Sequence, residues 1–322
     1  MKEDQPVNVA VIGCGYWGRN LVRNFYEAGV LRMVCESSED ARAFVSSQYL
    51  DVRVSEDFSA AFEDKSIGAI AIATPASTHV DLAMAALAAG KDVYVEKPLA
   101  LDMEEGEKLV AEANRLDRIL MVGHLLWYHP VVLKLKEIVD SGVLGKLRYI
   151  TSHRLNFGKV RYEENVLWSF APHDISVILG LVGEMPEVHS CTGGHYLSEQ
   201  VADVTSTELR FPSGVRAHLF MSWLHPFKEQ KLVVVGEEKM AVFDDVEKED
   251  KLVLYNQSIR WDEGVPVAVK SAGEPVAFDR SEPLRNEVDS FVRAVQFRTA
   301  PYPDGAEGLR VLKVLKDCQA SL

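Results

Sequence analysis

Residues 7–18 read VNVAVIGCGYWG, an apolar run that leads directly into the three glycines Gly13, Gly15 and Gly18. A buried strand that ends in a G-x-G-x-x-G turn and continues as a helix is typical of dinucleotide-binding folds. Gly13 permits the tight turn, Gly15 lets the backbone approach a pyrophosphate, and Gly18 lets the helix pack on the strand. The N-terminus of that helix would then offer N–H groups to the phosphates.

An acidic residue follows at the spacing that such folds require. Glu36 directly follows a second mostly apolar run, residues 31–35. It lies about twenty residues after Gly18, which is the distance seen in dinucleotide-binding proteins. Its carboxylate would accept hydrogen bonds from the adenosine ribose and repel a 2′-phosphate, which predicts NAD rather than NADP as the cofactor. Arg42 is the nearest basic residue that could favour NADP, but we expect it on a solvated helix face. A glycine-rich turn without a ligand is the alternative.

The first 122 residues alternate short apolar runs with stretches of helical period. Strands are expected over residues 7–12, 31–35, 67–73, 92–96 and 119–122, and helices over residues 19–28, 40–49, 77–89 and 102–116. Strands that alternate with helices of this length predict βαβ units and a parallel sheet. We therefore predict an α/β Rossmann domain over residues 1–122.

Beyond residue 122 the pattern changes to that of an α+β domain. Helices are expected over residues 130–141, 172–182, 287–296 and 306–317, and strands over residues 203–210, 215–222, 232–235 and 251–255. Most of these strands alternate apolar and polar side chains, as antiparallel strands with one buried face do. Residues 123–322 are therefore predicted to form a second domain with a large, mostly antiparallel open sheet.

The composition excludes several classes of protein. The 322 residues are 47% hydrophobic and 26% charged, as in globular proteins, and 48 acidic against 35 basic side chains give a net charge of −13. This charge disfavours binding to nucleic acids and to anionic membranes. No apolar run is long enough to span a membrane, residues 1–6 are too polar for a signal peptide, and the four cysteines form no CxxC pair. We expect a cytoplasmic protein without disulfides or a metal site.

The first group of chemically active side chains follows two strands of the predicted parallel sheet. Residues 73–75 read Ala-Thr-Pro and residues 96–98 read Glu-Lys-Pro, and the carboxyl ends of such strands face the ligand crevice. Lys97 would lie beside a nicotinamide and could exchange a proton with a substrate hydroxyl. A lysine in an ordinary surface turn is the alternative. Besides the glycines and Glu36, the candidate cofactor contacts are Tyr16, Trp17, Thr74, Pro75, His79, Glu96 and Lys97.

The second group lies in residues 167–174, which read LWSFAPHD. Pro172 is a natural first residue of a helix, so His173 would lie in the first turn. There the helix dipole disfavours the imidazolium, which would leave His173 neutral and able to act as a base. Asp174, in the same turn, would orient His173 or interact favourably with the dipole. A structural histidine in an apolar helix is the alternative.

With these residues the sequence resembles the glucose–fructose oxidoreductase/inositol dehydrogenase/MocA family. The resemblance implies an NAD-binding Rossmann domain and an open-sheet domain through which the chain forms a homodimer or homotetramer. It also implies that Lys97 is the catalytic lysine and His173 the catalytic histidine. Ser169 stands where many members carry an aspartate, which weakens an aspartate–histidine relay and inositol as substrate. The matching segments cover nearly the whole chain: residues 13–18, 73–79, 88–91, 95–100, 123–124, 140–145, 172–174, 284–287 and 304–308.

Within the family, residues 123–130 and 167–180 most resemble members that oxidise the 3-hydroxyl of UDP-N-acetylglucosamine-type sugars to a ketone for a later aminotransferase. Residues 154–162 add three cations and two aromatic rings that could bind a diphosphate and stack a base, with a solvated loop as the alternative. The other functions considered are a dehydrogenase of a free sugar, polyol or inositol, a redox-neutral NAD-dependent glycosidase, and an NAD-binding sensor. The candidate substrate contacts are His124, Tyr128, Lys159, Arg161, Trp168 and Asp174.

Overall fold

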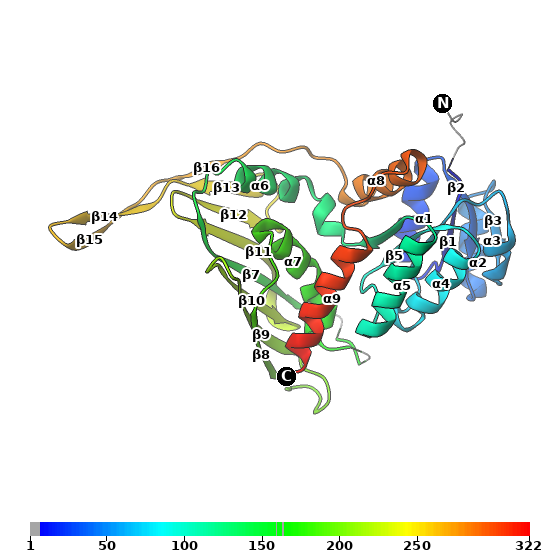
Figure 1. Cartoon of the computed structure of the whole chain (residues 1–322), viewed down its shortest axis with the longest axis horizontal. Helices are drawn as coiled ribbons and strands as arrows, with labels where there is room; N and C mark the ends of the chain where they lie inside the picture. The colour runs from blue at the N-terminus through cyan, green and yellow to red at the C-terminus, as the bar shows by residue number, and fades with distance from the viewer. Residues whose placement is uncertain (1–6, 159, 163) are drawn as a thin grey trace. The chain divides into compact units, whose positions relative to one another are not determined.

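The computed structural model describes residues 7–158, 160–162 and 164–322, apart from the side chain of Val188. It divides into two compact units, one containing the chain up to Tyr128 together with residues 281–312, the other containing residues 129–280 and 313–322 (Figure 1). This division differs from the predicted boundary at residue 122, because α8 (Pro283–Phe297) and most of α9 (Gly305–Gln319) return to the first unit. No helix in the described part of the chain is long and apolar enough to cross a bilayer.

The first unit is built on a six-stranded parallel sheet in the order β3-β2-β1-β4-β5-β6. The predicted parallel Rossmann sheet is thereby confirmed. Because helices flank such a sheet, β1, β4, β5 and β6 are wholly buried, and all but β5, which begins and ends with an acidic residue, read as continuous apolar runs. The strand order reverses between β1 and β4, and ligands bind at such switch points. The strands are β1 (Val9–Ile12), β2 (Leu31–Cys35), β3 (Arg53–Ser55), β4 (Ala69–Ile72), β5 (Asp92–Glu96) and β6 (Leu120–Gly123).

The helices predicted for the first unit are confirmed to within a few residues, whereas the short helix over residues 59–63 was not predicted. Helix α4 packs against α5, and α1 packs against α8 (Figure 1). Helix α4 ends just before Gly90, whose φ of 75° is the left-handed conformation that glycine commonly adopts after a helix C-terminus. The helices between the strands are α1 (Gly18–Glu27), α2 (Glu39–Gln48), α3 (Ser59–Glu63), α4 (His79–Ala88) and α5 (Met103–Arg115), with a short 3-10 turn η1 (Ala76–Thr78).

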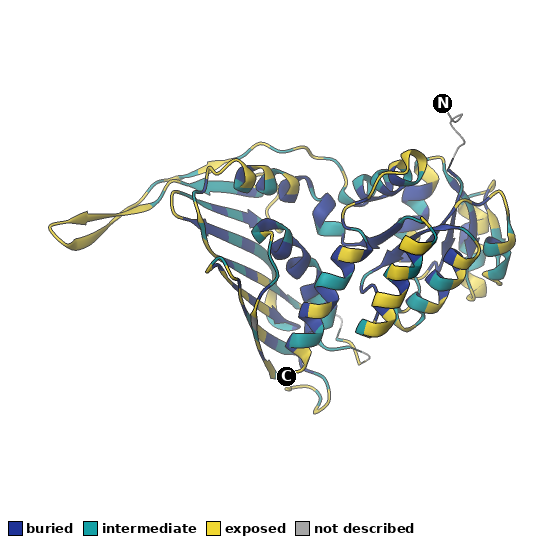
Figure 2. Cartoon of the chain, in the orientation of Figure 1, coloured by how far each residue is buried: buried dark blue, intermediate teal, exposed yellow. Residues whose placement is uncertain are grey.

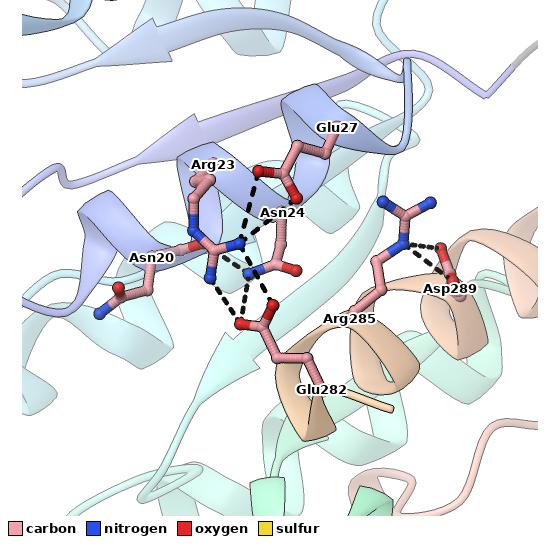
Figure 3. A network of polar contacts seen from close by, with 7 residues as sticks. All are labelled: Asn20, Arg23, Asn24, Glu27, Glu282, Arg285 and Asp289. Atoms are coloured by element: carbon pink, nitrogen blue, oxygen red, sulfur yellow. Dashed lines mark hydrogen bonds and ion pairs between the residues drawn. The ribbon is translucent and has the colours of Figure 1, made fainter. Parts of the chain in front are cut away.

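A polar network and an aromatic contact fasten α8 to α1. Figure 3 shows Arg23 of α1 between Glu27 of the same helix and Glu282, which precedes α8. These charges are partly exposed, so the ion pairs contribute little to stability. Beside them, the buried rings of Phe25 and Phe291 lie edge to face with centroids 6.2 Å apart. This buried apolar packing accounts for the return of the chain to the first unit.

The second unit contains an eight-stranded sheet in the order β16-β13-β12-β11-β7-β10-β9-β8. Among its pairings, β7 with β10 is parallel and the others are antiparallel, so the predicted large, mostly antiparallel sheet is confirmed. Helix α7 (Val166–Val182) packs on β7, β9 and β10, and α6 (Pro130–Asp140), which follows the 3-10 turn η2 (Leu125–Tyr128), packs on β12. The strands are β7 (Leu147–Phe157), β8 (Val188–Gly194), β9 (Val204–Arg210), β10 (Arg216–Ser222), β11 (Leu224–Gly236), β12 (Met240–Asp244), β13 (Leu252–Tyr255) and β16 (Gly273–Pro275).

Besides the strands β8, β12 and β16, two further parts of the second unit were not predicted. Strand β7 is an inner strand of the large sheet and includes Arg154 to Phe157, which the sequence had suggested to be part of a binding segment or a solvated loop. The other part is a separate hairpin of β14 (Ser258–Asp262) and β15 (Val265–Val269), which is exposed along its whole length (Figure 2). Its turn residues Glu263 and Gly264 both have positive φ, as a two-residue turn between antiparallel strands requires.

Candidate functional site

The glycine-rich turn has the shape that a dinucleotide requires. A Cβ on Gly13, whose φ is 94°, would lie 2.8 Å from the Ala73 carbonyl, and a Cβ on Gly18 would lie 2.3 Å from the Gly13 carbonyl oxygen. Folding itself therefore requires glycine at both positions. A Cβ on Gly15 would meet no atom within 4 Å. Gly15 thus faces open space beside the start of α1, which has no side-chain cap, and the neighbouring Tyr16 is 94% exposed. This is a fitting cradle for a pyrophosphate.

The two kinds of glycine predict opposite behaviour of two alanine variants. Gly15→Ala should keep the melting temperature of the wild type, while its Kd for NAD should rise about tenfold, equal to about 1.4 kcal/mol, because the methyl group meets the pyrophosphate. Gly18→Ala should lower the free energy of unfolding by about 1–3 kcal/mol through its clash with Gly13. Thermal unfolding of the apoprotein and calorimetric titration with NAD separate the effects. An unchanged Kd in Gly15→Ala would remove Gly15 from the cofactor site.

Glu36 ends β2 and reaches back to the glycine-rich turn. Its Oε2 accepts a hydrogen bond from the Cys14 N–H at 2.5 Å, and its Oε1 accepts one from the Ser38 N–H at 2.9 Å. Burial raises the pKa of Glu36, but these bonds, with one from the Ser37 hydroxyl, outweigh burial and lower it. The carboxylate is thus held as an anion beside the turn. Arg42 does not lie on a solvated face as expected, because it donates to the carbonyl oxygens of Glu36 and Ser37.

His79 joins the turns that follow β4 and β5. Its Nδ1 lies 2.8 Å from the Pro98 carbonyl oxygen and its Nε2 lies 3.0 Å from the Thr74 carbonyl oxygen. The side chain is 1% exposed, and burial lowers its pKa although both carbonyls oppose that shift. His79 therefore fixes the turns that carry Pro75 and Lys97. Both ring nitrogens face backbone oxygens, and the predicted contact of His79 with the cofactor stays a prediction.

Glu96 is the centre of a buried polar cluster at the end of β5. Its Oε1 accepts hydrogen bonds from Trp17 Nε1 at 2.5 Å and from the Tyr94 hydroxyl at 3.0 Å, and its Oε2 accepts one from the Lys97 N–H at 3.3 Å. The bond from Trp17 ties the glycine-rich turn to the turn that carries Lys97. Glu96 was predicted to contact the cofactor, and the structure gives its carboxylate three donors from the chain itself.

His124 and Tyr128 follow β6 and differ in what their side chains contact. The His124 side chain is 2% exposed, and neither ring nitrogen has a hydrogen-bond partner among the described residues. Burial, and then the charge of Lys97, lowers the pKa of His124 to about 3, so its neutral ring retains hydrogen-bonding capacity for a ligand. The buried Tyr128 hydroxyl donates to the Tyr302 carbonyl oxygen at 2.5 Å. The Tyr128 hydroxyl thus has a partner within the first unit, and its predicted contact with substrate stays a prediction.

Helix α7 starts earlier than the sequence predicted. Asn165 is its N-cap, and the Asn165 Oδ1 accepts a hydrogen bond from the Trp168 N–H at 3.1 Å. Pro172 therefore lies inside the helix and His173 near its middle, so the prediction of a first-turn histidine was wrong. The dipole argument for a neutral His173 fails with it, because the dipole acts on the first and last turns.

Asp174, which the sequence predicted to contact substrate, anchors α7 to β7. Its Oδ2 accepts a hydrogen bond from Arg154 Nε at 2.6 Å, and its Oδ1 accepts one from Arg154 Nη2 at 3.2 Å and one from the Ser152 hydroxyl at 2.9 Å. The side chains of Arg154 and Asp174 are only 12% and 7% exposed. This buried pair also removes Arg154 from the group of cations predicted to bind a diphosphate.

The remaining predicted substrate contacts lie in and before α7. Arg161 Nη1 is 2.9 Å from Glu164 Oε1, and the Arg161 side chain is 44% exposed. Trp168 Nε1 donates to Gln319 Oε1 at 3.0 Å, so the indole N–H faces the end of α9. Lys159 lies outside the described residues. Within the ranges that the structure describes, no three histidine, cysteine, aspartate or glutamate side chains gather as a metal site.

Sequence reasoning missed two buried groups of the first unit, Tyr94 and Glu287. The Tyr94 hydroxyl lies within hydrogen-bonding distance of both Glu96 and Glu287. Glu287 follows Leu284 by three residues and precedes Phe291 by four, so it stands in the apolar stripe of α8. An acidic residue on the core-facing stripe of a helix is the signal that could have identified it.

Two family models match the chain. An oxidoreductase family with an NAD-binding Rossmann fold matches residues 7–124, and the GFO/IDH/MocA C-terminal domain matches residues 132–242. The chain belongs to the GFO/IDH/MocA family. This GFO/IDH/MocA protein is therefore an NAD-dependent oxidoreductase that acts on CH–OH groups. The open cradle at Gly15 and the anionic Glu36 fit this cofactor.

Relatives of this GFO/IDH/MocA protein differ in the substrates that their names contain. A UDP-N-acetylglucosamine 3-dehydrogenase from Acidithiobacillus ferrooxidans is 26% identical over 95% of this chain and 94% of its own. A scyllo-inositol 2-dehydrogenase (NAD(+)) from Bacillus subtilis is 29% identical over 73% of each chain. A solved structure of the Acidithiobacillus ferrooxidans enzyme has a TM-score of 0.86 at 25% identity, covering 98% of this chain and 97% of the other. A putative oxidoreductase from Magnetospirillum magnetotacticum has a TM-score of 0.84 at 30% identity, covering 97% and 99%.

Proposed function

We propose that the chain oxidises the 3-hydroxyl of a UDP-linked amino sugar, UDP-N-acetylglucosamine or its uronic acid, with NAD as the oxidant. The observation that carries this proposal is similarity over 95% of the chain to a UDP-N-acetylglucosamine 3-dehydrogenase. The resemblance of residues 123–130 and 167–180 to enzymes of this kind supports it. Ser169, where an aspartate is frequent in inositol dehydrogenases, favours a UDP-sugar over an inositol.

Bound NAD would accept a hydride from the carbon that carries the reacting hydroxyl. The chain's own residues bind, orient and move a proton. Glu36 accepts hydrogen bonds from the ribose. The ring nitrogens of His124, which have no partner in the part of the chain that the structure describes, are available to a ligand. Lys97 or His173 takes the proton of the reacting hydroxyl as general base.

The test is a substrate panel with purified protein and NAD, followed by NADH absorbance. The panel contains UDP-N-acetylglucosamine, its uronic acid, myo-inositol and glucose, each with and without an aminotransferase and glutamate to remove the ketone. We expect NADH with a UDP-sugar, increased by the aminotransferase. A signal with inositol or glucose instead would make the chain a polyol or sugar dehydrogenase. Bound NAD without any signal would favour the redox-neutral glycosidase or the sensor.

Arg161 is the described basic residue proposed to bind the diphosphate. Arg161→Ala is expected to raise KM for the UDP-sugar about tenfold, because a hydrogen bond between charged groups contributes about 1.5–3 kcal/mol. KM for NAD should not change. Initial rates at varied concentrations of each substrate measure the difference. The control is Arg216→Ala, which removes an arginine that is paired with Glu208 and is 57% exposed. An unchanged KM for the sugar in Arg161→Ala would exclude Arg161 from the diphosphate site.

We propose that the chain forms a homodimer or homotetramer through the large sheet. Tyr149 of β7 and Phe220 of β10 are 43% and 37% exposed, on the sheet face opposite to the buried Ile150 and Leu219. Exposed aromatic side chains on a continuous sheet face are typical of an interface. Light scattering at micromolar concentration should give a multiple of 35.9 kDa, and a monomer would contradict this assembly.

A further inference from the structure

The carboxyl groups of Glu96 and Glu287 lie on either side of one tyrosine hydroxyl. The Tyr94 Oη is 3.0 Å from Glu96 Oε1 and 3.1 Å from Glu287 Oε2. Tyr94 and Glu287 are fully buried, and Glu96 is 9% exposed. A phenol hydroxyl carries one hydrogen, so it can donate to one carboxyl group only. The second contact therefore needs a hydrogen that comes from a carboxyl group.

The donors around the two carboxyl groups show which one carries that hydrogen. Glu96 accepts from Trp17 Nε1 at 2.5 Å and from the Lys97 N–H at 3.3 Å, besides Tyr94. Glu287 Oε2 has the Tyr94 hydroxyl beside it, and Glu287 Oε1 has no hydrogen-bond partner within the described ranges. An ionised carboxylate has about four acceptor sites and is costly to bury with so few donors. The balance of donors therefore assigns the charge to Glu96 and the hydrogen to Glu287.

We propose that Glu287 is a neutral carboxylic acid that donates to the Tyr94 hydroxyl, which in turn donates to the Glu96 carboxylate. Each hydrogen bond then donates in the same direction, from Glu287 through Tyr94 to Glu96. The Glu96 carboxylate also accepts hydrogen bonds from Trp17 Nε1 and from the Lys97 N–H. Glu287 is thus a positioning residue for the turn that carries Lys97. Its effect on turnover rests on the proposed function of Lys97, whereas its protonation state does not.

The titratable groups that face Glu287 are consistent with the neutral acid. Burial, and then the charge of Glu96, raises the pKa of Glu287 well above its usual range, and the hydrogen bond from Tyr94 opposes this only in part. Burial also raises the pKa of Tyr94 and of Tyr128, so both phenols stay protonated. Burial raises the pKa of Glu96 too, on balance, and three hydrogen bonds and the charge of Lys97 limit this rise.

Close packing keeps the Tyr94 hydroxyl between the two carboxyl groups. The Tyr94 ring lies edge to face with Phe25 and Phe291, at centroid distances of 6.4 and 5.8 Å. On the side of β6, a Cβ on Gly123 would lie 2.5 Å from the Tyr94 Oη and 3.0 Å from Glu96 Oε2. The glycine at position 123 therefore provides the space that the hydroxyl and the Glu96 carboxylate share.

Infrared difference spectroscopy of the wild type against Glu287→Gln tests the protonation state without any substrate. At neutral pH we expect the wild type to show the carbonyl stretching band of a protonated carboxylic acid that the variant lacks. A carboxylate band in its place would overturn the proposal. Because this measurement needs neither NAD nor sugar, its outcome is independent of the proposed function.

The pH dependence of stability provides a second test. A neutral Glu287 keeps its proton in the folded protein, while the unfolded chain loses it above a pKa of about 4.3. Its contribution to stability is therefore full below that pH and is lost as pH rises toward the raised folded pKa, at up to a tenfold fall in the folding equilibrium constant per pH unit. Glu287→Gln should remove this fall, and the exposed control Glu107→Gln should retain it. The same slope in Glu287→Gln and the wild type would contradict a buried proton.

Turnover separates positioning from simple packing. The amide of Glu287→Gln can still donate to Tyr94, so its kcat should stay within about threefold of the wild type, less than 1 kcal/mol of barrier. Glu287→Leu fills the space without a donor, and its kcat should fall about tenfold, with Kd for NAD unchanged. Full turnover in folded Glu287→Leu would overturn the positioning role even if the infrared band is present.

Discussion

Lys97→Ala is expected to lower kcat by roughly two to four orders of magnitude, the usual contribution of a general acid or base. Lys97 follows β5 in a parallel sheet, at the edge where such sheets bind ligands, and its backbone N–H is fixed by Glu96. The glycine-rich turn and Glu36, which are expected to hold most of the cofactor, do not depend on the lysine side chain. Kd for NAD should therefore change little. Steady-state rates with the active UDP-sugar and calorimetric titration with NAD measure the two quantities.

Two further variants define what Lys97 does. Lys97→Arg keeps a positive charge but cannot exchange a proton near neutral pH, so it should remain as slow as Lys97→Ala if proton transfer is the task. Recovery of turnover in Lys97→Arg would indicate a purely electrostatic role. Lys108→Ala, which removes an exposed lysine of α5, is the control and should match the wild type. Undiminished turnover in Lys97→Ala would exclude the mechanism.

The Rossmann unit could be predicted from the sequence because its signals are local. The strand, the turn and the helix around Gly13 and Gly18 follow one another, so the spacing of the glycines already defines their contact. The end of β5 at Glu96 could be predicted for the same reason, since a continuous apolar run stops there. In such segments the local preferences and the final packing agree.

The second unit was harder to predict because polar side chains interrupt its core-facing positions. Ser152 is buried and Arg154 nearly so, both on the helix-facing side of β7, where an alternating pattern would lead one to expect apolar residues. The strand therefore resembled a basic loop. Similarly, Pro172 is a strong signal for the start of a helix, and for this reason the predicted start of α7 was too late. The true N-cap, Asn165, is identified by the hydrogen bond that its side chain accepts from the Trp168 N–H.

The cluster around Tyr94 depends on residues that are distant in sequence. Glu287 joins it across 193 positions, after α8 has returned to pack against α1. No spacing rule links two such positions, and the direction of a hydrogen bond between them depends on how many donors each carboxyl group meets after folding. The sequence could identify Lys97 as a candidate, but the groups that hold its turn became visible only in the folded unit.

Asp174→Ala is expected to destabilise the protein by about 3–5 kcal/mol, because it leaves the Arg154 guanidinium buried without its counter-charge. The same change removes the acceptor of the Ser152 hydroxyl and detaches α7 from β7. Urea unfolding monitored by circular dichroism measures the loss. Glu237→Ala is the matched control, because it breaks an ion pair with Arg148 on the surface. The Arg148 side chain is 56% exposed and that of Glu237 is 38% exposed, so this variant should lower the free energy of unfolding by at most about 1 kcal/mol.

The double variant Arg154→Met/Asp174→Leu separates the cost of an unpaired charge from the contribution of the pair. Replacing a buried ion pair with apolar side chains of similar volume is often neutral, so the double variant should recover most of the stability that Asp174→Ala loses. Recovery together with unchanged turnover would mean that the pair only anchors α7. Recovery with reduced turnover would instead support the predicted role of Asp174 at the substrate site, beside its contacts with Arg154 and Ser152. A loss below about 1 kcal/mol in Asp174→Ala would show that the pair is solvated in the protein and that α7 is held by its apolar face alone.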